Sequence, residues 1–148
     1  MAYQFRMEQV LEYKQQVKDR TQKEYIEKQG RFEEIGYELY EALKKKETLQ
    51  AQQSQRMMDG DKVITLQHYN QYIDQLDFQV ESLQQRLKHA RENMQTAHER
   101  LLSETIDVKK YEKLKERQFS RYQYDSKIEE MKATDELAVL RYTSNEIR

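Results

Sequence analysis

The sequence predicts an all-α protein: a long two-helix antiparallel coiled-coil hairpin with a C-terminal helical extension, forming one domain over residues 1–148. Two observations lead to this prediction. The chain contains no proline and only three glycines, the two residue types that most disfavour helix interiors. Apolar and charged residues each make up 36% of the chain, so it can cover one narrow stripe along each helix but cannot fill a thick core.

The first helix is expected over about residues 4–58. Its apolar stripe is less regular than that of the second helix and consists of Met7, Val10, Val17, Thr21, Tyr25, Phe32, Ile35, Leu39, Ala42 and Leu49. Lys14, Lys28 and Lys46 interrupt this stripe. Because their aliphatic stems can cover a narrow seam while the ammonium groups reach water, we expect the stripe to continue through them.

The turn is expected at residues 59–62, where glycine stands between aspartates. Gly60 can adopt the positive φ that ends a helix, and Asp61 can cap the helix that follows. The sequence therefore predicts two helices that double back on each other.

The second helix is expected over about residues 63–118. From Leu66 to Leu101, apolar or small residues fill every a and d position of five heptads. These positions are Leu66, Tyr69, Ile73, Leu76, Val80, Leu83, Leu87, Ala90, Met94, Ala97 and Leu101. An isolated amphipathic helix would carry a wider stripe and would need a globular body to lie on, and no such body is visible in the sequence.

Both helices depart from the strict heptad, at Thr21 in the first and at Leu101 in the second. Such stutters unwind a supercoil locally and are accommodated most easily where both helices unwind together. Thr21 and Leu101 are equally distant from residue 61, the centre of the predicted turn, which favours a hairpin over a parallel dimer of one long helix. Arms of roughly 50 to 55 residues would form a rod about 80 Å long.

The C-terminal extension, residues 119–148, is prone to helix but has no tidy apolar repeat and no facing partner in the hairpin. An unpaired helix of this length is marginal in water. We expect a binding partner to order it, and the alternative is a helix that frays.

Composition disfavours several classes of protein. The 26 basic and 27 acidic residues are interleaved, which does not suit a nucleic-acid binder. The absence of cysteine fits a reducing compartment. The chain opens without an apolar signal region and has no run of about 18 apolar residues, so we expect no membrane insertion and a cytoplasmic location.

No catalytic, cofactor or metal site is expected. Long solvated helices do not build a concave site. His68, His89 and His98 do not have the i, i+4 spacing of a helical metal site. The sequence therefore predicts a non-enzymatic protein that binds other proteins.

Two groups of surface residues are candidates for binding. Tyr37, Tyr40, Tyr72 and Phe78 lie beside the seam near the turn, where exposed aromatic rings can anchor a partner; alternatively, the rings pack along the helix groove. A second group lies at the open end and consists of Arg6, Tyr13, Lys14, Arg20, Lys109, Lys113, Arg117 and Arg121. Surface charge of this kind often serves only solvation.

Short motifs occur in an order that resembles the FliJ family of flagellar type III export proteins over nearly the whole chain. Phe5, Arg6, Val10 and Leu11 match the family's opening motif, and Tyr69, Tyr72, Ile73 and Leu76 match the stretch after its turn. The segments YEKLKERQFSRY and DELAVLRY are similar to its ending.

The resemblance implies an antiparallel coiled coil similar to the central-stalk γ subunit of rotary ATP synthases. Its implied partners are a hexameric export ATPase, a membrane export-gate protein and export chaperones, at the cytoplasmic face of the membrane at the flagellar base. The implied gate contacts are Tyr72, Leu76, Val80, Ala42 and Leu49, with Lys45 standing where a family member can have an aromatic residue. The implied ATPase contacts fall within residues 6–20 and 109–121.

Two alternatives stay open at this point. The chain could be a coiled-coil spacer or tether without a role in energy coupling. It could also be the equivalent stalk of a non-flagellar type III secretion system.

Overall fold

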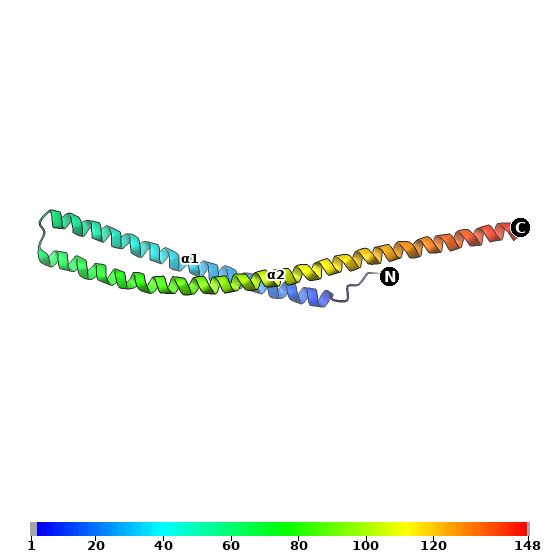
Figure 1. Cartoon of the computed structure of the whole chain (residues 1–148), viewed down its shortest axis with the longest axis horizontal. Helices are drawn as coiled ribbons and strands as arrows, with labels where there is room; N and C mark the ends of the chain where they lie inside the picture. Colours follow the sequence, from blue (N-terminus) through cyan, green and yellow to red (C-terminus); the bar gives the residue numbers. More distant parts are fainter. Residues whose placement is uncertain (1–2, 148) are drawn as a thin grey trace. The chain divides into compact units, whose positions relative to one another are not determined.

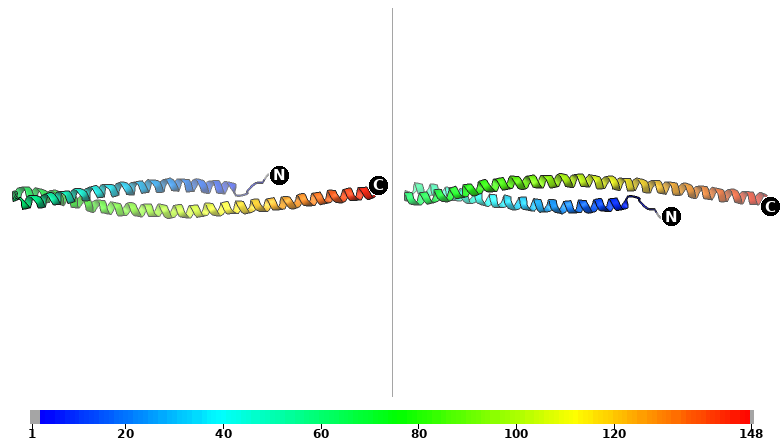
Figure 2. Two further views of the ribbon diagram at one scale, coloured as in Figure 1. Left: turned by 90° about the horizontal axis from the view of Figure 1, so that it is seen from above. Right: turned by 90° about the horizontal axis from the view of Figure 1, so that it is seen from below.

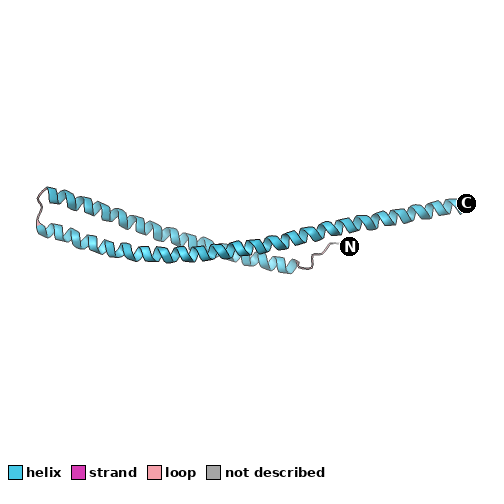
Figure 3. Ribbon diagram, viewed as in Figure 1, coloured by secondary structure: helices cyan, strands magenta, loops and turns pink. Residues whose placement is uncertain are grey.

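The structure, a computed structural model, describes residues 3–147 and consists of two helices joined by a short turn (Figures 1 and 3). Helix α1 comprises Glu8–Met58 and helix α2 comprises Val63–Ile147. No strand occurs among the described residues. The predicted all-α helical hairpin is confirmed, but α1 begins at Glu8 instead of near Gln4. Helix α2 continues without a break through the predicted extension as far as Ile147.

The sequence predicts one domain, whereas the contacts within the chain group into two units. We call residues 19–102 the turn unit, because it contains the turn. The terminal unit consists of the residues up to Lys18 together with those from Ser103 onward. Each unit combines part of α1 with part of α2 and is described by itself.

The turn closes the end of α1 with a left-handed glycine, as predicted. Gly60 has a φ of 75°. The Gly60 N–H donates to the carbonyl of Met57 (3.3 Å) and the Asp61 N–H donates to that of Arg56 (3.0 Å), the hydrogen-bond pattern of a Schellman motif. Only glycine adopts this conformation without a steric penalty from Cβ.

Asp61 lies one residue too early to cap α2 as predicted. Lys62 occupies the capping position, because its carbonyl accepts the N–H of Leu66. The Asp61 carboxylate instead accepts the Lys62 N–H at 2.8 Å and the Arg56 guanidinium at 3.0 Å. These two hydrogen bonds lower the pKa of Asp61, the one from Lys62 contributing most. Asp61 therefore ties the end of α1 to the start of α2.

The core of the turn unit follows the predicted heptads of α2. All of the predicted seam residues from Leu66 to Leu101 are buried or half-buried, and every residue between them is exposed. Ile35 and Ala42 of α1 form a buried cluster with Val80, Leu83 and Ala90 of α2, and Phe32, Leu39 and Leu87 pack against it. Leu39 and Leu83 are equally distant from residue 61, as are Ala42 and Val80, and both pairs meet in this cluster, as the predicted hairpin requires.

The helices of the turn unit run antiparallel, side by side from the turn (Figures 1 and 2). Ion pairs join Lys46 to Asp77, Glu38 to Arg86 at 3.9 Å, and Glu24 to Arg100 at 3.6 Å. The partners in each pair are nearly equidistant from residue 61, as the predicted register requires. Exposed pairs of this kind contribute only about 0–1 kcal/mol each, so apolar burial supplies most of the stability of this unit.

The interrupting lysines behave in two ways. Lys46 is half-buried in the seam and pairs with Asp77, and Lys14, in the terminal unit, is half-buried and lies 3.9 Å from Asp107. Both therefore cover the seam with their stems, as expected. Lys28 is exposed, and its neighbours Gln29 and Gly30 are half-buried in its place.

The start of the α1 stripe differs from the prediction. Leu11 is 4% exposed and packs with Phe5 and Val108, whereas Met7 and Val10 are each 37% exposed. Leu11 lies three residues before Lys14, so both side chains are on the same face of α1, and this face packs against α2. The choice of Val10 in the sequence analysis was therefore wrong by one residue.

In the terminal unit the seam contains polar residues near Lys18 and Ser103. Val17 and Lys18 are both half-buried, and so are Glu104 and Thr105. Because two adjacent residues are half-buried on each helix, the burial pattern does not assign a single seam position there. The predicted stutter at Thr21 and Leu101 therefore stays a prediction. Among the described residues Glu104 Oε2 is buried without a hydrogen-bond partner.

The last part of α2 is exposed on all sides among the described residues. From residue 129 to residue 146 every side chain is exposed, and the apolar side chains of this segment face solvent.

Candidate partner-binding surfaces

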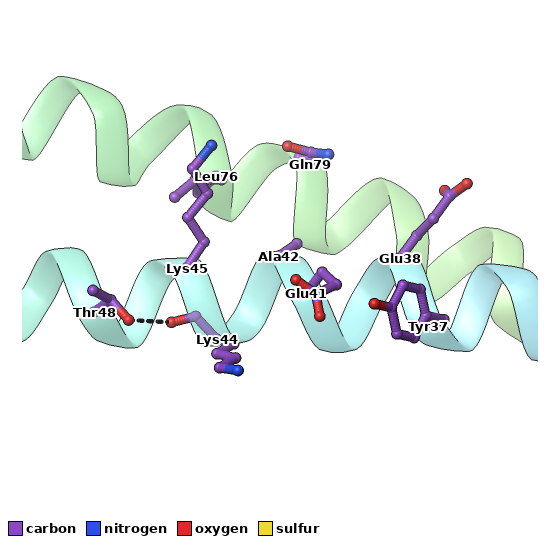
Figure 4. Close-up of a pocket in the computed structure, with 9 residues that line it drawn as sticks. All are labelled: Tyr37, Glu38, Glu41, Ala42, Lys44, Lys45, Thr48, Leu76 and Gln79. Atoms are coloured by element: carbon purple, nitrogen blue, oxygen red, sulfur yellow. Dashed lines mark hydrogen bonds between the residues drawn. The ribbon is translucent and has the colours of Figure 1, made fainter.

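A groove runs along one edge of the turn unit, and we call it the turn-side groove (Figure 4). It has a volume of about 610 Å³ and is lined by Tyr37, Glu38, Glu41, Ala42, Lys44, Lys45, Thr48, Leu76 and Gln79. Ala42 and Leu76 are buried seam residues. Because the alanine side chain is short, the seam is hollow at this point, and these two residues form an apolar floor.

Charged side chains form the rim of the turn-side groove. Glu38 and Glu41 lie toward one end, and Lys44 and Lys45 lie toward the other. In Figure 4, Lys45 reaches from α1 toward Leu76 of α2, whereas Lys44 points away from α2. The groove therefore combines an apolar floor with an acidic and a basic end.

Tyr72 lies beside this groove and is 43% exposed, as the sequence analysis expected. The Lys45 ammonium stands 5.3 Å from the centre of its ring, within the range of a cation–π contact. Lys45 stands at the position where the resemblance led us to expect an aromatic residue. In this chain it covers one face of the tyrosine instead of supplying a second ring.

The five expected gate-contact residues do not form one open surface. Tyr72 is exposed, Leu49 is half-buried, and Ala42 and Leu76 are reached only through the groove floor. Val80 is 7% exposed and belongs to the core cluster. Its contribution to any binding is limited to supporting the groove from within.

The other expected aromatic anchors are exposed. Tyr37 and Tyr40 on α1 and Phe78 on α2 are each more than half accessible to solvent. Their role as binding anchors stays a prediction. Tyr37 also lines the turn-side groove.

Most of the expected ATPase-contact residues are exposed and lie in the terminal unit. Arg6, Tyr13, Lys109, Lys113, Arg117 and Arg121 are exposed, and Lys14 is half-buried beside Asp107. Arg20 is also exposed but belongs to the turn unit.

One side of α2 in the terminal unit is basic. At 3.6 residues per turn, Lys109, Lys110, Lys113, Arg117 and Arg121 lie within about a third of the helix circumference, opposite Val108. We call these five residues the basic face. Within the described chain none of them forms an ion pair. Lys110 was not among the predicted binding residues, although its spacing of three from Lys113 indicates a shared face.

Lys115 belongs to the packing side of α2 and not to the basic face. Its ammonium lies 2.7 Å from the Glu8 carboxylate, and this hydrogen bond is the main cause that raises the pKa of Lys115. Glu8 and Lys115 are nearly equidistant from residue 61. The ion pair therefore places the first turn of α1 on α2 in the predicted antiparallel register.

The residues before α1 pack on α2 through aromatic rings. The Tyr3 hydroxyl donates to the Lys115 carbonyl at 3.2 Å, and the Tyr3 ring centre lies 5.1 Å from that of Phe119 and 5.4 Å from that of Tyr122. Phe5 is buried beside Val108. Sequence patterns did not predict this cluster, although the pair of aromatic residues just before the first helix is a signal for it. The extension was expected to lack a facing partner from residue 119 onward, and Phe119 and Tyr122 correct that expectation.

Other kinds of site are absent from the part of the chain that the structure describes. No group of three or more histidine and acidic side chains is placed to hold a metal ion among residues 3–147. Neither described helix carries a segment apolar and long enough to cross a bilayer.

Comparison with known proteins finds one family and one curated relative. Residues 3–146 match the family described as "Flagellar FliJ protein". The flagellar FliJ protein of Bacillus subtilis (strain 168) is 34% identical over 142 residues, which cover 96% of this chain and 97% of that protein. No solved structure matches.

Proposed function

Because the chain belongs to the FliJ family of flagellar proteins, we propose that it is a stalk of the flagellar type III protein export apparatus. In this role it binds a hexameric export ATPase and links it to a membrane export-gate protein. It has no enzymatic activity of its own and is recruited from the cytoplasm to the cytoplasmic face of the membrane at the flagellar base. The observation that carries the proposal is that two chemically different surfaces lie in two separate units of the chain.

The ATPase contact is assigned to the terminal unit. Among the described residues none of the five cations of the basic face forms an ion pair, so they can attract an acidic surface without first breaking one. Arg6 and Tyr13 of the same unit are also exposed. Charged surfaces of this kind mainly set association rate and orientation, which suits a stalk that must enter a ring.

The gate contact is assigned to the turn-side groove. Tyr72 stands at its edge with about half of its surface available for burial, and Ala42 and Leu76 offer an apolar floor. An aromatic anchor that becomes fully buried typically accounts for about 2 kcal/mol or more, which is about a thirtyfold change in affinity.

Export chaperones are a third class of partner in this proposal. No surface of the chain is assigned to them, because neither the groove nor the basic face distinguishes them from the other two partners.

Co-purification with the export ATPase, combined with an assay of its turnover, tests the proposal. We expect the hexameric ATPase to retain this protein and to hydrolyse ATP faster in its presence. Replacement of Lys113 and Arg117 by glutamate should reduce both effects. A control with the same change of charge, K23E/K28E, alters two exposed lysines of the turn unit and should reduce neither. Retention without any change in turnover would instead favour a spacer or tether.

A further inference from the structure

A stripe of exposed side chains runs along α2 on the side that faces away from α1. Its apolar members Ile106, Tyr124, Met131 and Tyr142 are each more than half exposed. All four belong to the terminal unit. They occur at spacings that return to one side of a helix, together with Lys113 and Arg117 of the basic face.

The balance of charge changes along this part of the helix. From Ile106 to Arg121 six basic residues stand against three acidic ones. From Tyr122 to Tyr142 five acidic residues, Asp125, Glu129, Glu130, Asp135 and Glu136, stand against three basic ones. None of the five residues of the basic face and none of these five acidic residues forms an ion pair within the described residues. A second helix of the same kind could therefore satisfy both halves, but only if it ran in the opposite direction.

We propose that the terminal unit self-associates, with a second copy of the chain docking antiparallel on this stripe around Tyr124. In this register the two Tyr124 rings meet on the two-fold axis, and Ile106 of each copy lies opposite Tyr142 of the other. Lys113 then lies opposite Asp135, and Arg121 lies beside Asp125, twice each by symmetry. A parallel arrangement would place equal charges side by side.

Two independent properties of the stripe support this pairing. The apolar residues coincide in one antiparallel register, and the same register joins opposite charges. Residues 106–142 span about 55 Å of helix, enough for a long contact between two copies. The association is nevertheless limited, because charged residues occupy several positions of the stripe and Lys109 of each copy comes near Arg141 of the other.

Self-association does not depend on the proposed export function. If both hold, the dimer covers the basic face, so dimer formation and ATPase binding exclude each other. The paired chain would then be a resting form that the ATPase opens by competition.

A charge exchange tests the dimer on the full-length protein. One variant carries K113E and R121E, and the other carries D125K and D135K. Each alone places equal charges opposite each other, whereas an equimolar mixture restores every pair. Sedimentation velocity should show a concentration-dependent dimer for the unmodified protein and for the mixture, and monomers for each variant alone. Circular dichroism checks that each variant is as helical as the unmodified protein.

Direction and specificity need separate controls. The K23E/K28E variant has the same charge change as the first variant in the turn unit and should dimerise normally. The dimer should weaken in 1 M salt, where screening shortens the reach of charges to about 3 Å. Because the chain has no cysteine, Y124C should form a disulfide-linked dimer on mild oxidation and M131C should not. An unmodified protein that stays monomeric, variants that dimerise alone, or efficient cross-linking through M131C would each overturn the proposal.

Discussion

Replacing glycines by alanine probes both the helices and the turn, because the three glycines have different surroundings. Gly36 lies inside α1, and a Cβ added there would meet only Leu87 Cδ1, at the ordinary contact distance of 3.8 Å. Nothing lies within 4 Å of a Cβ added at Gly30. Alanine is favoured over glycine in a helix interior by about 1 kcal/mol, so G30A and G36A should each stabilise the protein by up to that amount.

Gly60 should give the opposite sign. No atom lies within 4 Å of its added Cβ, so a clash with a neighbour is not the cause. Its φ of 75° is left-handed, and a residue with a Cβ loses about 1–2 kcal/mol in this conformation. G60A and G36A should therefore differ in stability by about 2–3 kcal/mol.

Urea unfolding followed by circular dichroism measures these differences directly. A loss of stability in G36A would mean that α1 and Leu87 lie closer than the structure places them. A neutral G60A would mean that the turn does not use a left-handed glycine. Either result would refute the explanation of these stability changes by the space around each glycine and by its backbone conformation.

Three further substitutions test the core, the groove and the turn. Leu83 is buried, so L83A should cost about 2–5 kcal/mol in urea unfolding, whereas F78A, at a ring that is 78% exposed, should cost little. Y72A removes an exposed ring and should scarcely change the melting temperature, so a large decrease would place Tyr72 in the core. Because the pKa of Asp61 is lowered from 3.8 in the folded protein, its carboxylate stabilises the fold above that pH and the contribution is lost as the pH falls through the folded pKa. D61N should therefore be less stable than the unmodified protein at neutral pH, and the difference should shrink below about pH 3.8; a difference independent of pH would contradict the assignment.

The seam of α2 was predictable residue by residue because apolar side chains occupy its heptads without interruption. The start of α1 was not. Lys14 and the half-buried Lys18 occupy seam positions there, so the apolar pattern did not distinguish the buried Leu11 from the exposed Val10. The spacing of apolar residues identifies the packing face of a helix only where the buried residues are themselves apolar.

The aromatic contacts of Tyr3 were beyond sequence reasoning for a different reason. Tyr3 lies outside any helix and meets Phe119 and Tyr122, which are far away in the sequence. Periodic patterns carry no information about such a contact. Once the register of the two helices is known, however, the ion pair between Glu8 and Lys115 places the residues before Glu8 close to Phe119.

The candidate gate contacts show a conflict between two kinds of inference. Resemblance pointed to Leu76 and Val80, while the heptads placed the same residues in the seam, and the structure buries both. The exposure of Tyr72 followed from its position beside the seam. A groove floored by Ala42 could not be predicted from spacing, because it depends on which side chain stands opposite a small residue.

The central claim is that the two units bind different partners, and one paired measurement tests it most directly. Affinity for the export-gate protein and stimulation of the export ATPase are measured for Y72A and for K113E/R117E. We predict that Y72A weakens gate binding about thirtyfold and leaves ATPase stimulation intact. K113E/R117E should reduce ATPase stimulation and leave gate binding intact. Equal loss of both activities in either variant would contradict the account.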